Sequence, residues 1–523
     1  RRQRQMCIRD SRKPLLSLLR WLIKMLLRAK SVMKNNQLKG WNGEPGDFIN
    51  QQFIAGKWQA GSGLQRTISS PASGVKLAIV PDASADDLNV AVARALEAQP
   101  AWYALGPVGR ANALKKASQR LRENADFLAR IDALDSGNPI KGMHFDVMLG
   151  ASLMDYFAGL TTEIKGETIP QRDGRLTYTT REPLGVVARL VAFNHPILFA
   201  AAKMAAPLAS GNAVIIKPSD ETPLSALWLG KILEDIFPEG VLSVLTGGPE
   251  LGSAICKHPD IAAVSLVGSV QTGKAVLKAA ADSMKRTQLE LGGKNALIIC
   301  PDADLDAAID GAVKGMNLGW TAGQSCGSTS RILAHSSVYD SVVEGLDKAF
   351  SSVRLGDPLS ENTEMGSLST KAQFNRVTEY IAGAKTEGAT VHAGSQSDVA
   401  NQNGYFVRPT LLTEVTPEMT VAREEVFGPV LCVLRWENET EMLQIANGLD
   451  VGLTASIWTE SIDTAMRLSS KIQAGYVWVN DSSDHYMGAP FGGVKNSGQG
   501  REECLDELLA YTEVKTVTIV QKS

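Results

Sequence analysis

The chain has few cysteines, and none of them follows the spacing that holds a metal. Its 523 residues include six, at positions 7, 256, 300, 326, 432 and 504, with no Cys-x-x-Cys pair and no Cys/His array. This absence excludes a zinc-finger or iron–sulfur site, and we predict no bound metal. We expect every cysteine except Cys326 to be a buried apolar thiol in a reducing compartment, and therefore a cytoplasmic location.

The chain also lacks a membrane-spanning apolar run and a basic body. Its Leu-rich stretch, Pro14–Lys30, is interrupted by three basic residues, so it is too short and too charged to span a bilayer. Residues 1–32 carry a net charge of +9, which leaves −12 for residues 33–523 of a chain whose total is −3. An acidic body does not suit nucleic-acid binding, and we expect no membrane partner for the folded body.

Residues 1–46 are interpreted as a non-native or flexible extension. The opening residues, RRQRQMCIRDS, resemble translated upstream sequence, and Met33 is a natural start. An amphipathic membrane-surface helix and a targeting presequence remain alternatives. We therefore leave this segment out of the fold prediction.

The length and the hydrophobic rhythm predict two α/β domains. A chain of 523 residues exceeds what one hydrophobic core usually serves. After Pro183, continuous apolar strands alternate with helices, and a second such series begins near Lys294. This alternation is typical of parallel sheets covered on both faces. Two segments alternate like strands outside both series, Leu176–Thr180 and Val514–Val520, and we expect them to pair as a small protruding sheet.

Local signals predict the elements of the amino-terminal part. Two short strands are expected at Gln52–Ile54 and Trp58–Ala60, around a turn. Ser84 and the acidic residues after it predict a helix that runs toward Gln99. We expect a single long helix from about Val108 to Leu134, because Gly137 follows as a stop signal.

Cys326 is the first candidate catalytic residue. It lies in a run of small residues, Ala322-Gly-Gln-Ser-Cys-Gly-Ser328, which lets a ligand approach the backbone closely. A thiol in such a loop is typical of a nucleophile. On this evidence alone, a tight loop with an incidental cysteine remains the alternative.

Glu290 and Asn194 are candidates for proton transfer and oxyanion binding. Glu290 stands between two leucines and before two glycines, so we expect partial desolvation, which raises a carboxyl pKa toward that of a general base. An ion pair with Lys294 is the alternative. Asn194 lies between a strand and a helix, where its amide can donate to a developing oxyanion or cap the helix.

Two strand ends are candidates for binding a nucleotide. Lys217-Pro-Ser-Asp220 ends a strand, where an ammonium and a carboxylate could hold ribose hydroxyls. The segment Leu266–Gly273 joins a strand to a helix, whose free N–H groups can face a pyrophosphate. The glycine pair at 268 and 273 does not form a Gly-x-Gly-x-x-Gly motif, so it is not decisive alone.

Taken in order, these motifs resemble the aldehyde dehydrogenase superfamily, in particular its non-acylating, betaine-aldehyde-dehydrogenase-like members. The resemblance covers about residues 47–523 and rests on seven motifs: Asn194, Lys217, Gly268-Ser269, Glu290-Leu-Gly-Gly293, Gly323-Gln-Ser-Cys326, Glu424-Glu-Val-Phe-Gly-Pro429 and Pro490-Phe-Gly-Gly-Val-Lys-Asn-Ser-Gly498. It implies an α/β fold of two parallel-sheet domains plus a small oligomerisation β-sheet. It also implies oxidation of a small-molecule aldehyde to its carboxylic acid with NAD(P)⁺.

The resemblance implies domain boundaries as well. An NAD(P)-binding domain is expected over residues 47–161 and 182–292, and a catalytic domain over 293–501. The oligomerisation sheet would take residues 162–181 and 502–523. A homodimer or a homotetramer follows from this family architecture.

Residue by residue, the resemblance assigns Cys326 as the nucleophile, Glu290 as the base and Asn194 as the oxyanion-hole side chain. It implies a cofactor site made of Lys217, Ser219, Asp220, Gly252, Gly268, Ser269, Gly292, Glu425 and Phe427. An acidic residue at 220 should repel a 2′-phosphate, so we expect NAD⁺. Because Asp is one methylene shorter than the Glu of many members, NADP⁺ remains the alternative.

The implied mechanism is covalent. Cys326 attacks the aldehyde, a thiohemiacetal becomes a thioester, and water activated by Glu290 hydrolyses it. The presence of Glu290 favours a free acid over transfer to coenzyme A. A semialdehyde or coenzyme-A-acylating dehydrogenase is the alternative enzyme, and a catalytically retired binding protein is the alternative outside enzymes.

The sequence departs from the family pattern in the expected substrate tunnel. His195 stands where many members have an aromatic residue, and Ala202 stands where many have a large one. These two departures predict a tunnel wide enough for a bulky or aromatic aldehyde. The alternative is that neighbouring side chains such as Phe199 fill the space. Asp481 and Asp484 are expected near the mouth, where with Tyr486 they could attract a cationic aldehyde or form a solvated rim.

Overall fold

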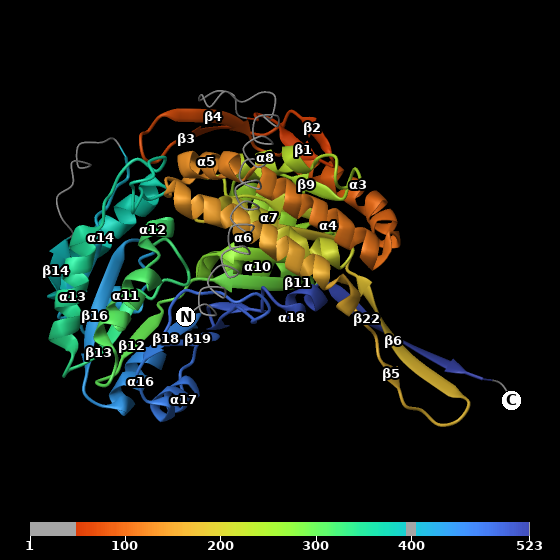
Figure 1. Ribbon diagram of the computed structural model, residues 1–523. Coiled ribbons are helices and arrows are strands. Elements are labelled where there is room, and N and C mark those ends of the chain that lie inside the picture. Colours follow the sequence, from red (N-terminus) through yellow and green to blue (C-terminus); the bar gives the residue numbers. More distant parts are fainter. Residues whose placement is uncertain (1–48, 394–403, 522–523) are drawn as a thin grey trace, which may run out of the picture. The chain divides into compact units, whose positions relative to one another are not determined.

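The computed structural model describes residues 49–393 and 404–521, which three larger sheets organise (Figure 1). The extension predicted over residues 1–46 lies outside the described residues. Within the part of the chain that is described, no helix combines the length and the apolar character that crossing a membrane requires.

The first sheet has eight strands with a parallel centre. Its spatial order is β2, β1, β9, β8, β7, β10, β11 and β21, and the five strands from β9 to β11 run parallel. Strands added to both sides of β7 make the gap between β7 and β10 a topological switch point, where parallel α/β sheets bind ligands. The strands span Gln52–Ile54 (β1), Lys57–Gln59 (β2), Val186–Leu190 (β7), Ala213–Lys217 (β8), Leu242–Val244 (β9), Ala263–Gly268 (β10), Arg286–Leu291 (β11) and Gly498–Gln499 (β21).

Helices cover both faces of this sheet because its central strands are apolar throughout. Val186 and Ile215 pack with Leu88 and Ile255 of one face, and the alternate positions of the same strands point the other way. One face carries α3 (Ala85–Ala104), α9 (Pro249–Lys257) and α10 (Val270–Ala281). The other face carries α7 (Pro196–Ala209) and α8 (Leu224–Leu233), backed by α4 (Gly106–Glu123), α5 (Ala125–Ser136) and α6 (Ile140–Gly159).

The second sheet has seven strands, and six of them are parallel. Its order is β14, β15, β16, β13, β12, β18 and β19, with only β14 antiparallel to its neighbour. The strands span Ala296–Ile299 (β12), Arg331–His335 (β13), Thr390–Ala393 (β14), Thr410–Thr413 (β15), Val430–Trp436 (β16), Thr454–Trp458 (β18) and Tyr476–Val479 (β19). The helices of this part are α11 (Leu305–Gly315), α12 (Leu318–Thr321), α13 (Tyr339–Ser352), α14 (Lys371–Glu387), α15 (Thr420–Arg423), α16 (Glu439–Asn447) and α17 (Ile462–Ser469).

Only the residues 292–295 separate the last parallel strand of the first sheet from the first strand of the second. β11 ends at Leu291 and β12 begins at Ala296. So short a link brings the carboxyl end of β11 next to the amino end of β12, because a chain of four residues spans at most about 14 Å. The two sheets therefore meet where the carboxyl ends of the first face the amino ends of the second.

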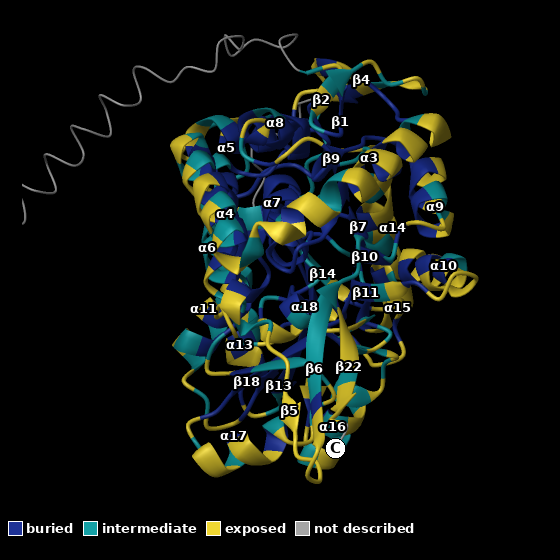
Figure 2. Ribbon diagram, turned by 90° about the vertical axis from the view of Figure 1, so that its right-hand side faces the viewer, coloured by how far each residue is buried: buried dark blue, intermediate teal, exposed yellow. Residues whose placement is uncertain are grey.

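A separate three-stranded antiparallel sheet confirms the predicted pairing of two segments that lie far apart in the sequence. β22 (Thr512–Val520) pairs along its whole length with β6 (Arg175–Pro183), and β5 (Thr168–Ile169) adds a short third strand. Most of these three strands is exposed or only partly buried (Figure 2). Short elements complete the fold: β3 (Gln65–Ser69), β4 (Lys76–Pro81), η1 (Thr161–Glu163), β17 (Val451–Gly452), β20 (Val494–Lys495) and α18 (Leu505–Ala510).

The α/β class and most central strands are as predicted, but the single helix over Val108–Leu134 is wrong. Two helices, α4 and α5, replace it, and Asn124 separates them with φ −112° and ψ 18°. The Asn124 side chain donates to the Arg120 carbonyl at 2.8 Å, which replaces the helical hydrogen bond that a continuing helix would make. Gly137 ends α5 in the left-handed conformation (φ +81°), as expected.

Candidate active site

The twelve predicted site residues all line two adjoining cavities. One, of about 180 Å³, is bordered by Asn194, Gly268, Ser269, Glu290, Gly292, Cys326, Glu425 and Phe427. The other, of about 610 Å³, is bordered by Lys217, Ser219, Asp220, Gly252, Gly268 and Ser269. The two cavities share the loop after β7 and the end of β10, so they form one groove across the switch point of the first sheet.

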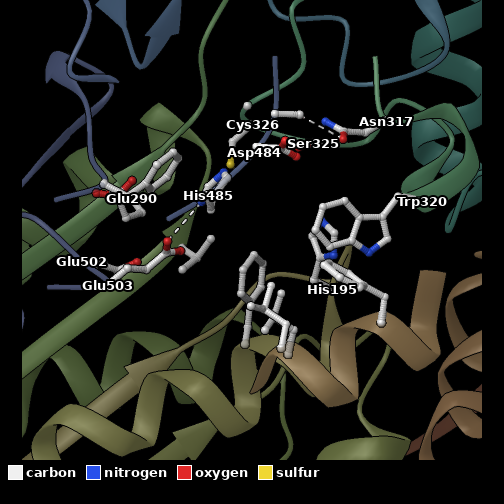
Figure 3. Close-up of a pocket in the computed structure, with 18 of the residues that line it drawn as sticks. His195, Glu290, Asn317, Trp320, Ser325, Cys326, Asp484, His485, Glu502 and Glu503 are labelled. Atoms are coloured by element: carbon white, nitrogen blue, oxygen red, sulfur yellow. Dashed lines mark hydrogen bonds and ion pairs between the residues drawn. The ribbon is translucent and has the colours of Figure 1, made fainter. Parts of the chain in front are cut away.

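A third cavity, of about 250 Å³, meets this groove at Cys326 and Glu290. Both residues border it and the 180 Å³ cavity, and Val267 does the same. We call it the substrate-side cavity. Its other walls come from α6, α7, α12 and the loop after β19 (Figure 3). The thiol and the carboxylate therefore stand where a groove and a pocket join.

Cys326 is held by its backbone. Its loop leaves α12 through two residues in the left-handed conformation, Ala322 (φ +51°) and Gly323 (φ +74°). The Asn295 amide then donates to the Cys326 carbonyl at 2.7 Å and to the Ser328 carbonyl at 3.0 Å. Asn295 belongs to the short link between the sheets, so that link fixes the thiol against the carboxyl end of β11.

The Cys326 thiol is protonated in this state. Burial raises its pKa to about 12, the carboxylates of Glu290 and Glu425 add to the rise, and Lys203 opposes it. At neutral pH an attack by this sulfur therefore needs a base that removes the proton.

Glu290 borders the same two cavities as Cys326, and its carboxyl group has no hydrogen-bond partner among the described residues. The side chain is 3% exposed, and neither carboxyl oxygen makes a hydrogen bond to any described residue. Burial and the neighbouring Glu502 raise its pKa well above the usual value, and Lys203 opposes this. The alternative of an ion pair with Lys294 finds no support within the described residues. The glycine run of the Pro490–Gly498 motif makes room here, because a Cβ at Gly492 would lie 2.7 Å from Glu290 Oε1.

A buried ion network lies behind Glu290. Lys203 Nζ pairs with Glu502 Oε2, and Arg189 Nη2 lies 3.0 Å from Glu502 Oε1 and 3.6 Å from Glu507 Oε1. Burial lowers the Lys203 pKa, but Glu502 and Glu507 outweigh it, so this pKa is raised overall and the amine stays charged. The network thus keeps the charged amine of Lys203 in the wall of the same cavity that Glu290 and Glu502 border.

Asn194 faces the thiol loop. It is 2% exposed and its amide nitrogen donates to the Gln324 carbonyl at 2.9 Å, which leaves the second N–H of the amide for a ligand. The alternative role as a helix cap is wrong, because His195 is the N-cap of α7. Asn138 holds this segment by donating to the Asn194 carbonyl at 2.9 Å.

The far end of the groove carries charged groups suited to ribose hydroxyls. Lys217 is 8% exposed, burial lowers its pKa, and Nζ donates only to the adjacent Pro218 carbonyl among the described residues. Asp220 lies nearby, with one oxygen 3.4 Å from Arg66 Nη1. Arg66 is bound mainly to Asp82, through contacts of 3.2 and 2.8 Å.

The near part of the groove fits a pyrophosphate and a nicotinamide riboside. Ser269 caps α10 and follows Gly268, so the positive end of a helix opens into the groove. Burial raises the pKa of Glu425 to about 7, while the Gly293 N–H, 3.2 Å from its carboxylate, opposes this. A Cβ at Gly292 would overlap Glu425 Oε2, so this glycine is required for the approach. Phe427 adopts φ +57° and meets Phe193 edge to face, with ring centroids 5.8 Å apart.

The residues expected in the tunnel fall into two groups. Phe199 borders the substrate-side cavity, whereas Ala202 lies beneath it in an apolar cluster with Leu153 and Leu198. At the mouth, Lys314 pairs with both Asp481 (3.0 Å) and Asp484 (2.7 Å). This cation neutralises much of the negative charge that was expected to attract a cationic aldehyde.

Sequence reasoning missed several polar residues of the site: Asp146, Arg189, Lys203, Asn295, Trp320, His485, Glu502 and Glu503. Lys203 had a signal, because it is the single charged residue in the apolar run Pro196–Ala209, and a buried charge needs a partner. Asp146 has the same signal in the largely apolar segment Phe145–Gly150. Neither signal identifies the partner.

Comparison with known proteins gives one consistent result. The model of the aldehyde dehydrogenase family matches residues 58–517. The chain is 46% identical over 480 residues to aldehyde dehydrogenase tropH of Talaromyces stipitatus, covering 89% of this chain and 92% of that protein.

Solved structures agree. The NAD⁺ complex of an aldehyde dehydrogenase from Bacillus cereus is 38% identical, covers 92% of this chain and 100% of its own, and has a TM-score of 0.88. PnpE from Pseudomonas sp. WBC-3 is 37% identical, covers 91% and 98%, and has a TM-score of 0.87.

Accessibility of the Cys326 sulfur can be tested by alkylation. Among the cysteines of the described residues, Cys326 should react first with iodoacetamide, because it borders two cavities and the other four are buried: Cys256, Cys300, Cys432 and Cys504. Its rate should rise about tenfold per pH unit above neutrality, since the thiolate fraction does so below the pKa. Timed quenching and peptide mass spectrometry measure both, and C326S is the control. If Cys326 in the native protein reacts no faster than the four buried cysteines, its sulfur does not have the predicted access to solvent.

Proposed function

This chain belongs to the aldehyde dehydrogenase family, and we propose that it oxidises an aldehyde to the carboxylic acid through a covalent intermediate on Cys326. One observation carries the proposal: Cys326 and Glu290 both stand where the nucleotide groove meets the substrate-side cavity. An aldehyde in that cavity would lie against the sulfur from one side and a nicotinamide in the groove from the other.

NAD(P)⁺ is the cofactor of this enzyme, and the groove fits it. Lys217 and Asp220 would hold the adenosine ribose, Gly268 and Ser269 the pyrophosphate, and Glu425 with Phe427 the nicotinamide riboside. When bound, the cofactor supplies the hydride acceptor that turns the thiohemiacetal on Cys326 into a thioester. Ser219, Gly252 and Gly292 complete the walls of the groove.

The protein's own residues carry the proton transfers. Glu290, with its raised pKa and unpartnered oxygens, takes the thiol proton, directly or through a water, so that the sulfur can add to the carbonyl carbon. The free N–H of the Asn194 amide and the Cys326 backbone N–H donate to the oxyanion that forms. Glu290 releases the thiol proton to solvent before the second step. It then removes a proton from the water that attacks the thioester, and this proton passes to the departing thiolate, which releases the acid and restores the thiol.

Substitution of the two reacting residues tests this chemistry. C326A should produce no NADH with any aldehyde. E290Q should lower kcat by about 10² to 10⁴, the usual contribution of a general base, and should accumulate an acyl adduct on Cys326 in intact-protein mass spectra. Because the Glu290 pKa is raised, kcat of the wild type should increase with pH over a range that lies well above the usual pKa of a carboxyl group. E290Q should not show this increase.

The control for charge removal is E97Q, an exposed carboxylate on α3 that pairs with Arg94. It should behave as wild type. Undiminished NADH production by C326A, or a product that forms only when coenzyme A is present, would contradict the mechanism.

We propose NAD⁺ rather than NADP⁺ as the preferred form. The carboxylates of Asp82 and Asp220 offset the charges of Arg66 and Lys217, and Asp220 borders the groove, so a 2′-phosphate would meet no net positive charge and would lie against the Asp220 carboxylate. KM for NAD⁺ should be lower than for NADP⁺ at saturating aldehyde. D220N should lower the ratio of KM for NADP⁺ to KM for NAD⁺ at least roughly tenfold, about 1.4 kcal/mol, because it removes the repulsion between Asp220 and the 2′-phosphate. The neighbouring E221Q, which lies outside the groove lining, should change it far less. A lower KM for NADP⁺ in the wild type would refute the preference.

We propose that β22, β6 and β5 join a second copy of the chain in a homodimer or homotetramer. β22 is an edge strand of nine residues, and large apolar side chains are exposed on this sheet: Leu176 (48%), Val514 (52%), Ile519 (50%) and Val520 (56%).

The double variant L176K/I519E places opposite charges on cross-strand partners, so the two strands should still pair. Its sedimentation coefficient should nevertheless shift toward that of the monomer. The control L277K, at an exposed leucine of α10, should leave the sedimentation coefficient of the wild type unchanged. A wild type that sediments as a monomer ends the proposal.

A further inference from the structure

His195 forms a buried hydrogen-bonded group with a carboxylate from another helix. His195 Nδ1 lies 2.9 Å from Asp146 Oδ2 and 3.2 Å from Oδ1, and the indole N–H of Trp320 donates to Asp146 Oδ1 at 2.7 Å. Asp146 is fully buried on α6, and His195 is 6% exposed at the start of α7. Three separate segments thus converge on one imidazole.

This group fixes how the imidazole is presented. A carboxylate only accepts hydrogen bonds, so the proton of a neutral His195 lies on Nδ1. Burial raises the Asp146 pKa overall, and its contacts with His195 and Trp320 oppose part of the rise. Nε2, on the opposite edge of the ring, makes no hydrogen bond to any described residue. The ring therefore offers one oriented polar atom to a ligand.

The imidazole lies in the wall of the substrate-side cavity. Figure 3 shows His195 beside Trp320 on one side of this space and Glu290 on the other, and Cys326 also lines it. Two aromatic rings hold the imidazole edge to face, Trp320 at 4.7 Å and Phe199 at 5.4 Å between centroids. The atom offered by His195 and the reactive sulfur thus border the same space.

Local structure gives no other use for the histidine. His195 is the N-cap of α7, but its side chain makes no capping hydrogen bond. Its surroundings are apolar, including Leu198 and Leu149, where a phenylalanine would pack without a buried carboxylate. Burying an ionisable pair is costly, and such groups concentrate at functional sites.

The shape and charge of the cavity restrict the ligand. About 250 Å³ is small for a ligand pocket, and aromatic walls such as Phe145 and Phe491 suit a single ring. Glu290, Glu502 and Glu503 line the same space. Lys203 and Arg189 pair with Glu502, and His485 Nδ1 lies 3.1 Å from Glu503, so the carboxylate of Glu290 is the one without a partner among these three. This charge disfavours a substrate with its own carboxylate and leaves a neutral hydroxyl as the matching group.

We propose that His195, oriented by Asp146, selects aldehydes that carry a hydroxyl on a single ring, by accepting a hydrogen bond from that hydroxyl at Nε2. This inference rests on the proposed function, since it names the substrate class of the same site. His195 is a binding residue, and Asp146 is a positioning residue that acts through it.

The test compares benzaldehyde with its 3- and 4-hydroxy and 3- and 4-methoxy derivatives. For each protein, kcat/KM of a hydroxy compound is divided by that of the matching methoxy compound, which cannot donate. The wild type should favour the hydroxy compound at least tenfold for one ring position, the usual effect of leaving a buried polar group unpaired. H195F should bring this ratio to within about twofold of one, and dividing the two ratios cancels the intrinsic reactivity of each aldehyde.

The matched control is H144F on the same helix as Asp146. His144 also pairs with a carboxylate, Asp126 at 3.3 Å, but this pair is exposed and does not border the cavity. The same replacement there should leave the selectivity ratio of the wild type intact. D146N, which keeps an acceptor for Trp320 but removes the ionic acceptor of Nδ1–H, should lower the ratio in the same direction as H195F.

Two further measurements distinguish a loss of folding from a loss of function. If H195F does not retain the circular dichroism and melting of the wild type, H195N takes its place, because its shorter amide can still donate to Asp146 and leaves no acceptor at the position of Nε2. A wild type that oxidises no aldehyde of a broad panel, aliphatic aldehydes included, with NAD⁺ or NADP⁺ overturns the proposed function itself. A wild type that oxidises other aldehydes but none of these five overturns this inference alone. A wild type that oxidises these five without preference for a hydroxyl, or an H195F that keeps the preference, overturns this inference alone.

Discussion

The short connection Gly292–Asn295 holds the site together, because it ties the carboxyl end of β11 to the amino end of β12. Glu290 stands just before this link, and Asn295 at its end bonds the carbonyl of Cys326. The proposed base, Glu290, lies in the first sheet, and the proposed nucleophile, Cys326, lies in a loop that leads into the second, yet their separation is limited by the same few residues. The Gly292 position also lacks room for a Cβ, because Glu425 approaches it from the second sheet. A longer or bulkier link would loosen the contact between the groove and the substrate-side cavity.

Around this link the protein tolerates charges that a purely structural core would avoid. Glu290 is buried, and neither of its oxygens has a hydrogen-bond partner in the described part of the chain. Lys203, Arg189 and Glu502 form an ion network, and two of its members, Lys203 and Glu502, border the same cavity as Glu290. An unpaired buried carboxyl is unfavourable for stability, and its raised pKa is the direct consequence. In the proposed mechanism, the same raised pKa makes Glu290 a stronger base than an ordinary carboxylate. Stability and chemistry thus pull in opposite directions at this position, which is expected at functional sites.

The sequence was a good guide wherever a property is local. The apolar runs of β7, β8 and β10 predicted parallel strands, and the alternation at Leu176–Thr180 and Val514–Val520 predicted two strands that do pair. The motif residues predicted for the site all border connected cavities. The helix over Val108–Leu134 failed, because its interruption at Asn124 depends on a side-chain hydrogen bond that periodicity does not reveal. The helix α6 and the hairpin of β3 and β4 were also missed, and α6 carries Asp146.

What the sequence determined by itself is the order and the chemistry of the reacting groups: a thiol in a glycine-rich loop, a carboxylate between leucines, an amide before a helix. These follow from residue type and near neighbours, which the chain specifies directly. Only the tertiary structure decided how each group behaves. Asp146 reaches His195 across 49 positions, and Glu502 reaches Lys203 across 299. A side chain's pKa, orientation and access depend on the dielectric and the partners around it, and those come from segments that only folding brings together.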